Sequence, residues 1–537
     1  MRPKQIDHGR LLRRLTLPAI AMSAVLITGH YAVGVPTRAA ADVTTYSASK
    51  IPSTWTQPNG DKAATRRVSG PINSRSVFKL GVAWTVPIKA PASPDRWPGT
   101  YATTPVVVDG IVYTQDLDAN VYAIELKTGN VLWTKMYDMS STGPNGVAYA
   151  GGKVFGATTT HAFALDAATG QEVWSKELVL NEFEGIDMAP AVHNGTVYFS
   201  TVPGNNAHFL AASGRGVLWA LDTDTGRTKW KFDTVPVDLW GNPEMNAGGG
   251  LWYPPSFDDK GNLYFTVANP LPFLGTKELP WGSSRPGPNL YTNSLVKLNA
   301  KTGKLIWYNQ VLPHDVNDWD LMLPPLLTTV HGRPVALSSG KMGIVYMFDQ
   351  ATGKLLWKTP VGLHNGHDDD NLFALRGEFD KLPSLPVTVY PGVLGGVMGP
   401  LAVDDTTVYA AVNNFPVTWN TQEPPPDFPA VTTGTGQMFA LDLATGRVKW
   451  VRDFDHTPYG ASTVVNDLVF TTTFDGTIHA LSTRTGETVW QDTLPAASNS
   501  PVAVQGKYVL AGGGWPMEDG QKAEIIAYRL GADGPAR

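Results

Sequence analysis

Residues 162–174, AFALDAATGQEVW, decide the fold of this chain. Alternating apolar residues lead to an acidic residue, a Thr-Gly turn follows, and three further residues lead to Trp174. Alternation of this kind predicts two short strands, and Gly170 supplies the positive φ that a tight turn needs. The segment therefore predicts a β-hairpin that carries a large aromatic residue on its second strand.

The same pattern recurs from one end of the chain to the other. It reads VYAIELKTGNVLW at 121–133, LWALDTDTGRTKW at 218–230, LVKLNAKTGKLIW at 295–307, VYMFDQATGKLLW at 345–357, MFALDLATGRVKW at 438–450 and IHALSTRTGETVW at 478–490. A second strand pair with its own turn precedes each copy, for instance at 191–198. Four strands in each repeated unit are typical of the blades of a β-propeller.

An eighth unit is split between the two ends of the chain. Residues 81–84, Gly-Val-Ala-Trp, supply a Trp-bearing strand without its turn, and residues 524–528, Glu-Ile-Ile-Ala-Tyr, supply a strand without its Trp. Pairing the two would close the ring and remove its open sheet edges. We therefore predict an all-β, eight-bladed β-propeller closed by its N- and C-terminal strands, with the repeated Trp residues wedged between blades.

The first 41 residues predict an export signal. Basic residues that include Lys4, Arg10, Arg13 and Arg14 precede an apolar run from Leu15 to Leu26, and Ala39–Ala41 offers a small-residue cleavage site. The alternative is an uncleaved membrane anchor, although the apolar run is short for a spanning helix. The prediction is a mature single domain at 42–537, secreted or in the periplasmic or cell-envelope space, with no stable membrane span after signal removal.

Composition excludes several classes of function. The 537-residue chain has no cysteine, which excludes disulfides, thiolate metal sites, Cys nucleophiles and covalently attached c-type haem. The formal charge is −5, and residues 1–41 hold six basic residues and one acidic residue, so the mature chain carries −10. Because no basic run remains, we expect no nucleic-acid partner.

Residues 313–320, Pro-His-Asp-Val-Asn-Asp-Trp-Asp, concentrate ionisable groups after Trp307. On a strand-like segment Asp318 and Asp320 would point the same way, about 7 Å apart, and would repel each other without a cation or a shared proton. The alternative is a solvated acidic loop. Long inserts precede Trp307 and Trp450, and long loops on one face of a ring are where binding groups gather. Within the second insert, 364–370 is either a second metal site or a hydrophilic loop.

The blade motif resembles that of the quinoprotein alcohol dehydrogenases, eight-bladed propellers that use pyrroloquinoline quinone (PQQ). The resemblance covers nearly the whole mature chain. Non-catalytic propellers such as the outer-membrane assembly lipoproteins share the motif. More specific matches are Gly248–Trp252 (GGGLW), Ala268–Pro272 (ANPLP) and the run from His314 to Asp320.

The resemblance implies which residues hold the cofactor. Trp252 is similar to the indole that forms the floor beneath the quinone, and the alternative is another blade Trp. Lys341, in the segment Gly-Lys-Met-Gly, falls where the family places a cation near a quinone oxygen. Asn413 or Asn414 is similar to an amide at the cofactor's rim, with a surface Asn as the alternative.

The resemblance also implies a metal site. Asp318 is similar to the catalytic base, which also touches the metal, and Asp320 stands where members that use lanthanides carry an extra carboxylate. Asn269 is similar to an amide ligand, and the alternative is a turn-forming Asn before Pro. Asn205 occupies the position of a metal-binding Glu. Oxygen ligands of this kind suit calcium or a lanthanide ion better than zinc.

The chain departs from the family pattern at several positions. The vicinal-cysteine disulfide beside the quinone is absent. Asn145 stands where an Arg would partner the quinone's carboxylates, and Asp187 stands where a cofactor-binding Thr is expected. A dry, unneutralised carboxylate there would cost several kcal/mol.

Two functions from different classes therefore remain. The first is an exported PQQ-dependent dehydrogenase that oxidises a small-molecule alcohol by hydride transfer to a metal-activated quinone, with Asp318 as base. Its electrons would leave to a separate acceptor, because no haem is attached to this chain. The second is a non-catalytic propeller that serves as a binding or envelope-assembly scaffold.

Overall fold

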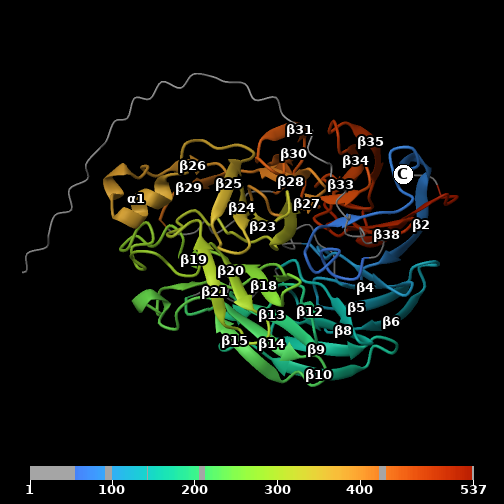
Figure 1. The fold of residues 1–537 in the computed structure, drawn as a ribbon, viewed down its shortest axis with the longest axis horizontal. Coiled ribbons are helices and arrows are strands. Elements are labelled where there is room, and N and C mark those ends of the chain that lie inside the picture. The colour runs from blue at the N-terminus through green and yellow to red at the C-terminus, as the bar shows by residue number, and fades with distance from the viewer. Residues whose placement is uncertain (1–54, 91–98, 142, 205–211, 423–430, 535–537) are drawn as a thin grey trace, which may run out of the picture. The chain divides into compact units, whose positions relative to one another are not determined.

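The computed structural model describes residues 55–90, 99–141, 143–204, 212–422 and 431–534. The predicted signal at 1–41 lies outside these residues and stays a prediction. The described residues form eight sheets of four or five strands that follow one another around a ring, as the colour order in Figure 1 shows. The eight-bladed β-propeller predicted from the repeats is confirmed.

Within each blade the four main strands run antiparallel, and in seven of the eight blades they follow the order of the sequence. The first four blades consist of β3 (Val106–Val108), β4 (Ile111–Gln115), β5 (Val121–Glu125) and β6 (Val131–Lys135); β7 (Ala148–Ala150), β8 (Lys153–Ala157), β9 (His161–Asp166) and β10 (Glu172–Glu177); β12 (Ala191–His193), β13 (Thr196–Pro203), β14 (Val217–Asp222) and β15 (Thr228–Asp233); and β17 (Ser256–Phe257), β18 (Asn262–Thr266), β20 (Ser294–Asn299) and β21 (Leu305–Gln310). A short strand, β11 (Glu184–Gly185), extends the third blade by pairing with β13.

The remaining four blades complete the ring. They consist of β22 (Leu326–Val330), β23 (Arg333–Ser338), β24 (Ile344–Asp349) and β25 (Leu355–Pro360); β27 (Ala402–Val403), β28 (Thr407–Asn414), β30 (Thr435–Asp442) and β31 (Val448–Phe454); β32 (Thr463–Val465), β33 (Leu468–Thr472), β34 (Thr477–Ser482) and β35 (Thr488–Thr493); and β36 (Ala503–Gln505), β37 (Tyr508–Gly513), β38 (Glu524–Leu530) and β2 (Leu80–Pro87).

The eighth blade joins the two ends of the described chain, as predicted. β2 pairs antiparallel with β38, and Trp84 lies opposite Ala527. β2 thus covers the edge of β38 and becomes the outermost strand of the last blade.

The repeated Trp and Gly residues pack against each other across blade boundaries. A Cβ added to Gly303 would lie 2.7 Å from the ring of Trp230 in the preceding blade, and the Gly of each of the six other Thr-Gly turns meets the preceding Trp at 2.6–2.8 Å. The Trp230 indole also donates to the carbonyl of Ala300 at 3.1 Å. The motif therefore encodes a joint between blades as well as a turn.

The turn itself is held by the acidic residue of the motif. Asp166 accepts hydrogen bonds from the backbone N–H of Thr169 at 2.9 Å and from its hydroxyl at 2.7 Å. The hydroxyl oxygen of Thr169 in turn accepts a hydrogen bond from the N–H of Gln171. These bonds satisfy the polar groups of the exposed turn and fix its shape.

An N-terminal segment lines the inside of the ring. Carbonyls of residues 55–66 accept hydrogen bonds from the inner strands of five blades. The pairs are Val107 with Trp55 at 2.7 Å, Phe257 with Lys62 at 2.8 Å, Leu327 with Ala63 at 2.8 Å, Val403 with Thr65 at 3.2 Å and Val464 with Arg66 at 2.8 Å. The segment ends in β1 (Arg67–Val68), which runs parallel to β32. It thus satisfies inner-strand N–H groups that face the axis.

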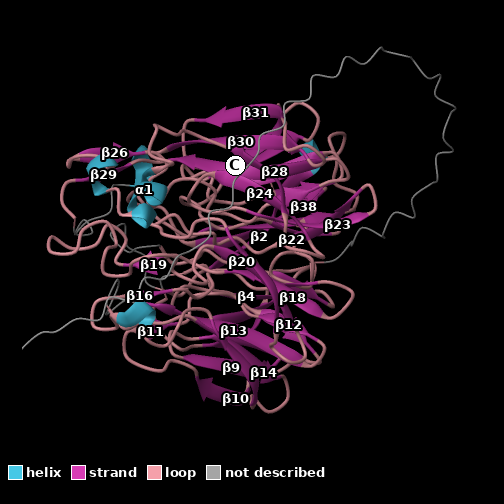
Figure 2. Cartoon of the chain, turned by 60° about the vertical axis from the view of Figure 1, so that its left-hand side comes forward, coloured by secondary structure: helices cyan, strands magenta, loops and turns pink. Residues whose placement is uncertain are grey.

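The two long inserts add small elements to the ring. They include the strand pairs β16 (Ala247–Gly248) with β19 (Pro270–Leu271) and β26 (Val387–Val389) with β29 (Val417–Trp419), and the helix α1 (Asp370–Arg376). Figure 2 shows these elements along the same side of the ring. Short 3-10 turns are η1 (Val77–Lys79), η2 (Leu239–Gly241), η3 (Phe379–Lys381) and η4 (Val431–Thr433). One face therefore carries most of the irregular structure.

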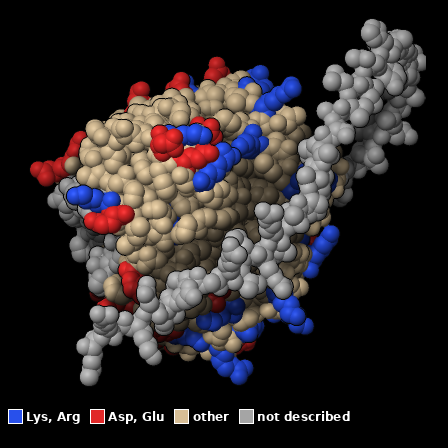
Figure 3. All heavy atoms as spheres, turned by 90° about the vertical axis from the view of Figure 1, so that its left-hand side faces the viewer, with Lys and Arg blue, Asp and Glu red and all other residues tan. Residues whose placement is uncertain are grey.

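Many charged side chains lie on the surface. On the face drawn in Figure 3, acidic and basic residues stand next to one another. Among the described residues, no helix combines the length and the apolar character that crossing a membrane requires.

Candidate active site

Residues 313–320 form a turn and not the strand-like segment considered in the sequence analysis. Asp315 is fully buried and accepts hydrogen bonds from the N–H groups of Asn317 at 2.8 Å and Trp319 at 2.7 Å. Asp318, between these contacts, has φ +61°. Side-chain bonds from one Asp to backbone N–H groups two and four residues on favour a turn over an extended strand.

Two buried side chains anchor this turn. Arg285 donates to the carbonyls of Asp315 at 2.5 Å and Pro272 at 2.9 Å. The ring nitrogens of His314 lie 3.1 Å from two backbone carbonyl oxygens, and burial lowers the pKa of His314 to about 4. The sequence did not single out Arg285, because a lone Arg in an irregular insert has no motif.

Lys341 lies between the two carboxylates that follow this turn. Its ammonium nitrogen is 2.8 Å from Oδ2 of Asp318 and 2.8 Å from Oδ2 of Asp320. The carboxylates are therefore close together, as the sequence indicated, although a turn and not a strand brings them there. All three side chains are buried, so the arrangement is not a solvated acidic loop.

Asn269 completes the cluster. Its Nδ2 donates to Oδ1 of Asp318 at 2.8 Å, and its backbone N–H donates to Oδ1 of Asp320 at 2.6 Å. The carbonyl of Asn269 accepts the N–H of Gly249 at 3.0 Å, which ties the Gly-rich segment to the cluster. The segments Gly248–Trp252 and Ala268–Pro272, which both resemble family motifs, therefore meet beside the acidic cluster.

Close backbone approach positions Lys341. Its N–H donates to the carbonyl of Asp320 at 3.0 Å. A Cβ on the neighbouring Gly340 would lie 1.6 Å from the same carbonyl oxygen, so only glycine fits there. The Gly-Lys-Met-Gly turn between β23 and β24 is thus built against the end of the acidic stretch.

Burial and charge shift the pKa values of this cluster. Desolvation raises the pKa of Asp318 well above its usual range, Lys341 opposes the increase and the charge of Asp320 adds to it. Burial alone would lower the pKa of Lys341, but Asp318 and Asp320 raise it overall. A carboxyl group that binds its proton more tightly than usual and an ammonium group that stays charged therefore face each other.

Trp252 and Asn413 lie near this cluster and leave polar atoms without partners. Trp252, half-buried, packs against an apolar group that includes Met322 and Val397, and its Nε1 has no hydrogen-bond partner among the described residues. Asn413, on β28, is buried, and its Oδ1 also has no partner there. By contrast, Asn414 accepts the N–H of Leu363 at 2.9 Å. Of the two amides, Asn413 has the open acceptor.

The remaining candidate residues are Asn205, Asp187 and Asn145. Asn205 lies in the undescribed range 205–211. Asp187 is buried and accepts the hydroxyl of Ser141 at 3.1 Å. Asn145 donates to the carbonyl of Asp116 at 2.7 Å. Asp187 and Asn145 thus each bond to another residue of the protein.

The loop at 364–370 forms two separate pairs. His364 contacts Asp368 at 2.8 Å, and His367 contacts Asp370 at 2.9 Å. No group of three or more His, Asp or Glu side chains in the described ranges is arranged to hold a metal ion. The described part thus supports the hydrophilic-loop interpretation of this segment, and the acidic cluster offers two carboxylates and one amide.

Comparisons with known proteins agree with the fold and the repeats. Residues 55–361, more than half of the chain, match the family model "Glucose/ethanol/alcohol dehydrogenase, beta-propeller domain". The chain belongs to the PQQ-dependent quinoprotein alcohol dehydrogenase family. Residues 341–531 also match a model for the outer membrane protein assembly factor BamB, whose repeats are of the same kind.

Individual relatives are divergent. The chain is 30% identical over 522 residues to the quinohemoprotein alcohol dehydrogenase of Comamonas testosteroni, covering 83% of this chain and 70% of the relative. It is 28% identical over 613 residues to the enzyme ADH-IIG of Pseudomonas putida, covering 97% of this chain and 81% of the relative.

The solved structures show the same architecture. The crystal structure of the Comamonas enzyme superposes with a TM-score of 0.75 at 26% identity, covering 92% of this chain and 82% of that one. A europium-containing methanol dehydrogenase superposes with a TM-score of 0.71 at 20% identity, covering 89% and 98%. The second likeness shows the fold alone.

Proposed function

We propose that this chain is an exported dehydrogenase that oxidises a small-molecule alcohol with PQQ. Membership of the quinoprotein family supports the class of reaction. The buried contact of Lys341 with both Asp318 and Asp320, at 2.8 Å each, carries the assignment of the site. Two carboxylates and an ammonium group kept out of water are an arrangement suited to proton transfer and charge stabilisation.

The described residues fit a quinone at this place. The unpartnered Nε1 of Trp252 and Oδ1 of Asn413 are buried polar atoms that a bound group with polar edges would satisfy. Trp252, Lys341 and Asn413 would therefore hold PQQ. When bound, PQQ supplies the two-electron acceptor for the hydride of the alcohol.

The donor set also suits a hard cation. Asp318, Asp320 and Asn269 offer carboxylate and amide oxygens, and Asn205 is the fourth ligand that we propose. Such ligands suit calcium or a lanthanide ion, which would act as a Lewis acid at the site. In the metal-free protein the ammonium of Lys341 compensates one of the two carboxylate charges.

Asp318 is the proposed catalytic base. It accepts the hydroxyl proton of the alcohol, and its raised pKa brings proton affinity closer to the working pH than that of an ordinary carboxylate. Asn269 and Lys341 hold one oxygen each of Asp318, so its orientation is fixed from both sides. Asp320 is held by the backbone N–H of Asn269 and positions Lys341.

Cofactor loading tests this proposal. Purified protein is incubated with PQQ and calcium or lanthanum, and the absorption spectrum and alcohol-dependent dye reduction are recorded. We expect a bound-quinone spectrum and turnover, with D318N retaining the spectrum but losing turnover. The matched control is D259N, because Asp259 is exposed on the surface. Turnover of D318N equal to that of the unmodified protein would remove Asp318 as the base.

A non-catalytic scaffold is the second candidate. The match of residues 341–531 to the assembly-factor model favours it, as do Asn145 and Asp187 at positions where the family resemblance implies other residues. A protein that binds neither PQQ nor metal in the loading experiment would be assigned to this second function.

For the first function, the dehydrogenase, we propose that the electron acceptor is a separate molecule.

A further inference from the structure

Asn293 is a fully buried residue at the end of the first long insert, directly before β20. Its backbone has φ +50°, a left-handed conformation that Asn adopts more readily than most residues. Its N–H donates to the carbonyl of Val267 at 2.9 Å, and its carbonyl accepts the N–H of Val311 at 2.9 Å. The backbone of Asn293 is therefore fixed between the segments that follow β18 and β21.

The side chain of Asn293 binds both ends of the acidic turn, residues 313–320. Its Nδ2 donates to Oδ2 of Asp315 at 3.0 Å, and its Oδ1 accepts the N–H of Leu321 at 2.8 Å. Asp315 lies near the start of the turn, and Leu321 directly follows its last residue. A single amide group thus spans the stretch that contains both Asp318 and Asp320.

The two partners determine the orientation of this amide. The N–H of Leu321 can only donate, and both carboxylate oxygens of Asp315 already accept backbone N–H groups, so the nitrogen of the amide faces Asp315. Exchange of the amide nitrogen and oxygen would break both bonds. Because Asn293, Asp315 and Leu321 are all fully buried, loss of either bond would leave a polar group without a partner away from water.

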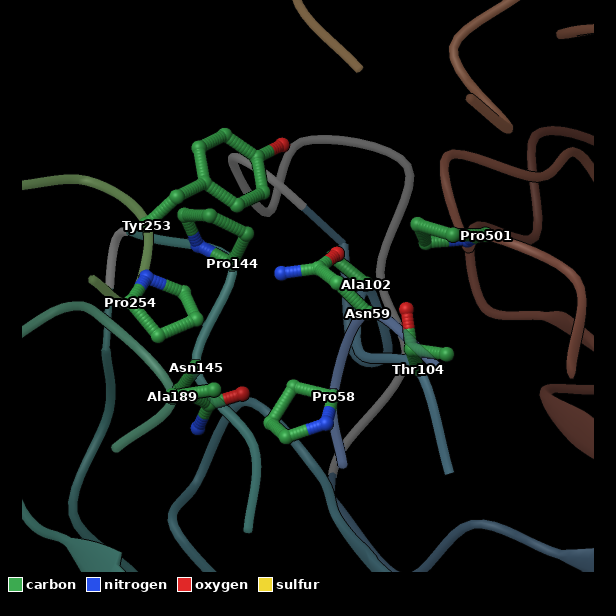
Figure 4. Close-up of a pocket in the computed structure, with 10 residues that line it drawn as sticks. All are labelled: Pro58, Asn59, Ala102, Thr104, Pro144, Asn145, Ala189, Tyr253, Pro254 and Pro501. Atoms are coloured by element: carbon green, nitrogen blue, oxygen red, sulfur yellow. The ribbon is translucent and has the colours of Figure 1, made fainter. Parts of the chain in front are cut away.

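Other buried asparagines are held less completely. Asn145 lines a cavity of about 20 Å³ (Figure 4). Its Nδ2 donates to the carbonyl of Asp116 at 2.7 Å, whereas its Oδ1 has no partner among the described residues. In Asn293, by contrast, both ends of the amide and both backbone polar groups are bonded. Asn293 is therefore the more rigid support.

Asn293 also connects the acidic turn to Asn269. Its N–H lies 3.3 Å from the carbonyl of Ala268, the residue before Asn269. Asn269 in turn donates to the carboxylates of Asp318 and Asp320. The same residue thus fixes the turn and the segment that supplies the amide partner of its carboxylates.

We propose that Asn293 is the positioning residue that holds Asp318 and Asp320 in their working geometry. It acts through the turn, since its side chain bonds to Asp315 and Leu321 and not to the two carboxylates themselves. The kinetic consequence rests on the proposed function, because it concerns the orientation of the base. A displacement of about 1 Å at a reacting group can cost about 100-fold in rate.

The variant N293D tests the bond to Asp315 without changing the size of the side chain. It replaces the donor by a carboxylate oxygen 3.0 Å from Oδ2 of Asp315, where like charges repel, and it keeps the acceptor for Leu321. In protein loaded with PQQ and metal we expect kcat to fall about 10- to 100-fold, with KM for the alcohol changed less than about threefold. An unchanged kcat would overturn the proposal.

Asn262 provides the matched control. Its Nδ2 donates to Oδ2 of Asp258 at 2.8 Å, at the opposite end of β18 from the first insert. N262D therefore creates the same contact between two carboxylates on the same blade, away from the acidic turn. We expect a lower melting temperature and an unchanged kcat. A loss of kcat as large as that of N293D would assign the effect to general destabilisation and contradict the positioning role.

Rescue by a second substitution separates the hydrogen bond from packing. In the double variant N293D/D315N the carboxylate and the amide exchange places, so a donor again faces an acceptor and the net charge is that of the unmodified protein. The N–H of Trp319, which donates to Oδ2 of Asp315 at 2.7 Å, would lose its acceptor. We therefore expect recovery of part of the kcat lost in N293D. A kcat no higher than that of N293D would show that the bond is not the cause.

Hydrogen–deuterium exchange tests the support of the turn without cofactor, metal or alcohol. The N–H groups of Asn317, Trp319 and Leu321 all donate within the protein, so peptides that cover 313–321 should exchange slowly. We expect faster exchange in N293D and in the uncharged variant N293G, since Gly adopts φ +50° without strain. N262D should exchange like the unmodified protein.

The two kinds of measurement fail separately. Protein that binds neither PQQ nor metal would remove the proposed function, and the exchange experiment would still decide whether Asn293 holds the turn. Equal exchange at 313–321 in N293D, N293G and the unmodified protein would overturn the proposal even if the loaded protein oxidises alcohol.

Discussion

The ammonium of Lys341 lies 2.8 Å from Oδ2 of Asp318, although a blade boundary separates them in the chain. Asp318 follows β21 of the fourth blade, and Lys341 sits between β23 and β24 of the fifth. The candidate site is therefore assembled across a joint between blades. Any change that loosens this joint should affect the site before it affects the rest of the ring.

The choice of metal should depend on Asp320. Two carboxylates in close contact are neutralised more fully by a trivalent ion than by calcium, so a light lanthanide should support more alcohol oxidation than calcium. D320A should erase this preference. Turnover with each ion, measured after loading with PQQ, checks the prediction, and a preference retained in D320A would contradict it.

The stability of the cofactor-free protein should fall as pH rises. Asp318 has a pKa raised in the folded state, so folding binds a proton between the usual carboxyl pKa of 3.8 and the raised value. The contribution of Asp318 to the free energy of unfolding is fully present below pH 3.8 and is lost as pH rises through the raised pKa. Urea unfolding across this range should show the slope in the unmodified protein and its loss in D318N. An equal slope in both proteins would exclude Asp318 as its source.

A Cβ atom on the Gly that packs against the Trp of the preceding blade should destabilise the protein. G303A places a methyl group 2.7 Å from Trp230 and forces a non-Gly residue to φ +67°, so we expect a loss of about 2–4 kcal/mol in unfolding free energy. G261A is the control, because Gly261 has φ +78° with open space around it. It should cost only about 1 kcal/mol. Equal losses in the two variants would show that the contact with Trp230 contributes nothing.

Removal of the C-terminal strand should open the ring. Truncation before Glu524 removes β38, to which both β2 and β37 bond, and leaves two unpaired strand edges. We expect aggregation, measured by light scattering and size-exclusion chromatography. A soluble truncated protein with an unchanged melting temperature would show that closure is dispensable.

Export should remove the first residues. The basic, apolar and Ala-rich order of residues 1–41 predicts cleavage near Ala41. N-terminal sequencing of the exported protein tests this, and material that still begins at Met1 would reject it.

The sequence by itself determined the ring. Each blade is specified locally, because alternating residues, a Thr-Gly turn and a Trp lie within thirteen positions and their contacts repeat at every joint. It also indicated that Asp318 and Asp320 are close, since two residues of separation keeps side chains near each other in a strand or a turn.

Tertiary structure decided what surrounds those residues. The conformation of the acidic turn depends on Arg285 and Asn269, which come from other segments, and no local pattern marks that contact. The same holds for Arg66, whose acceptors include Ser462 and Val502, almost 400 residues or more away. Burial and long-range pairing set the charge balance of both places, and these arise only when the ring closes.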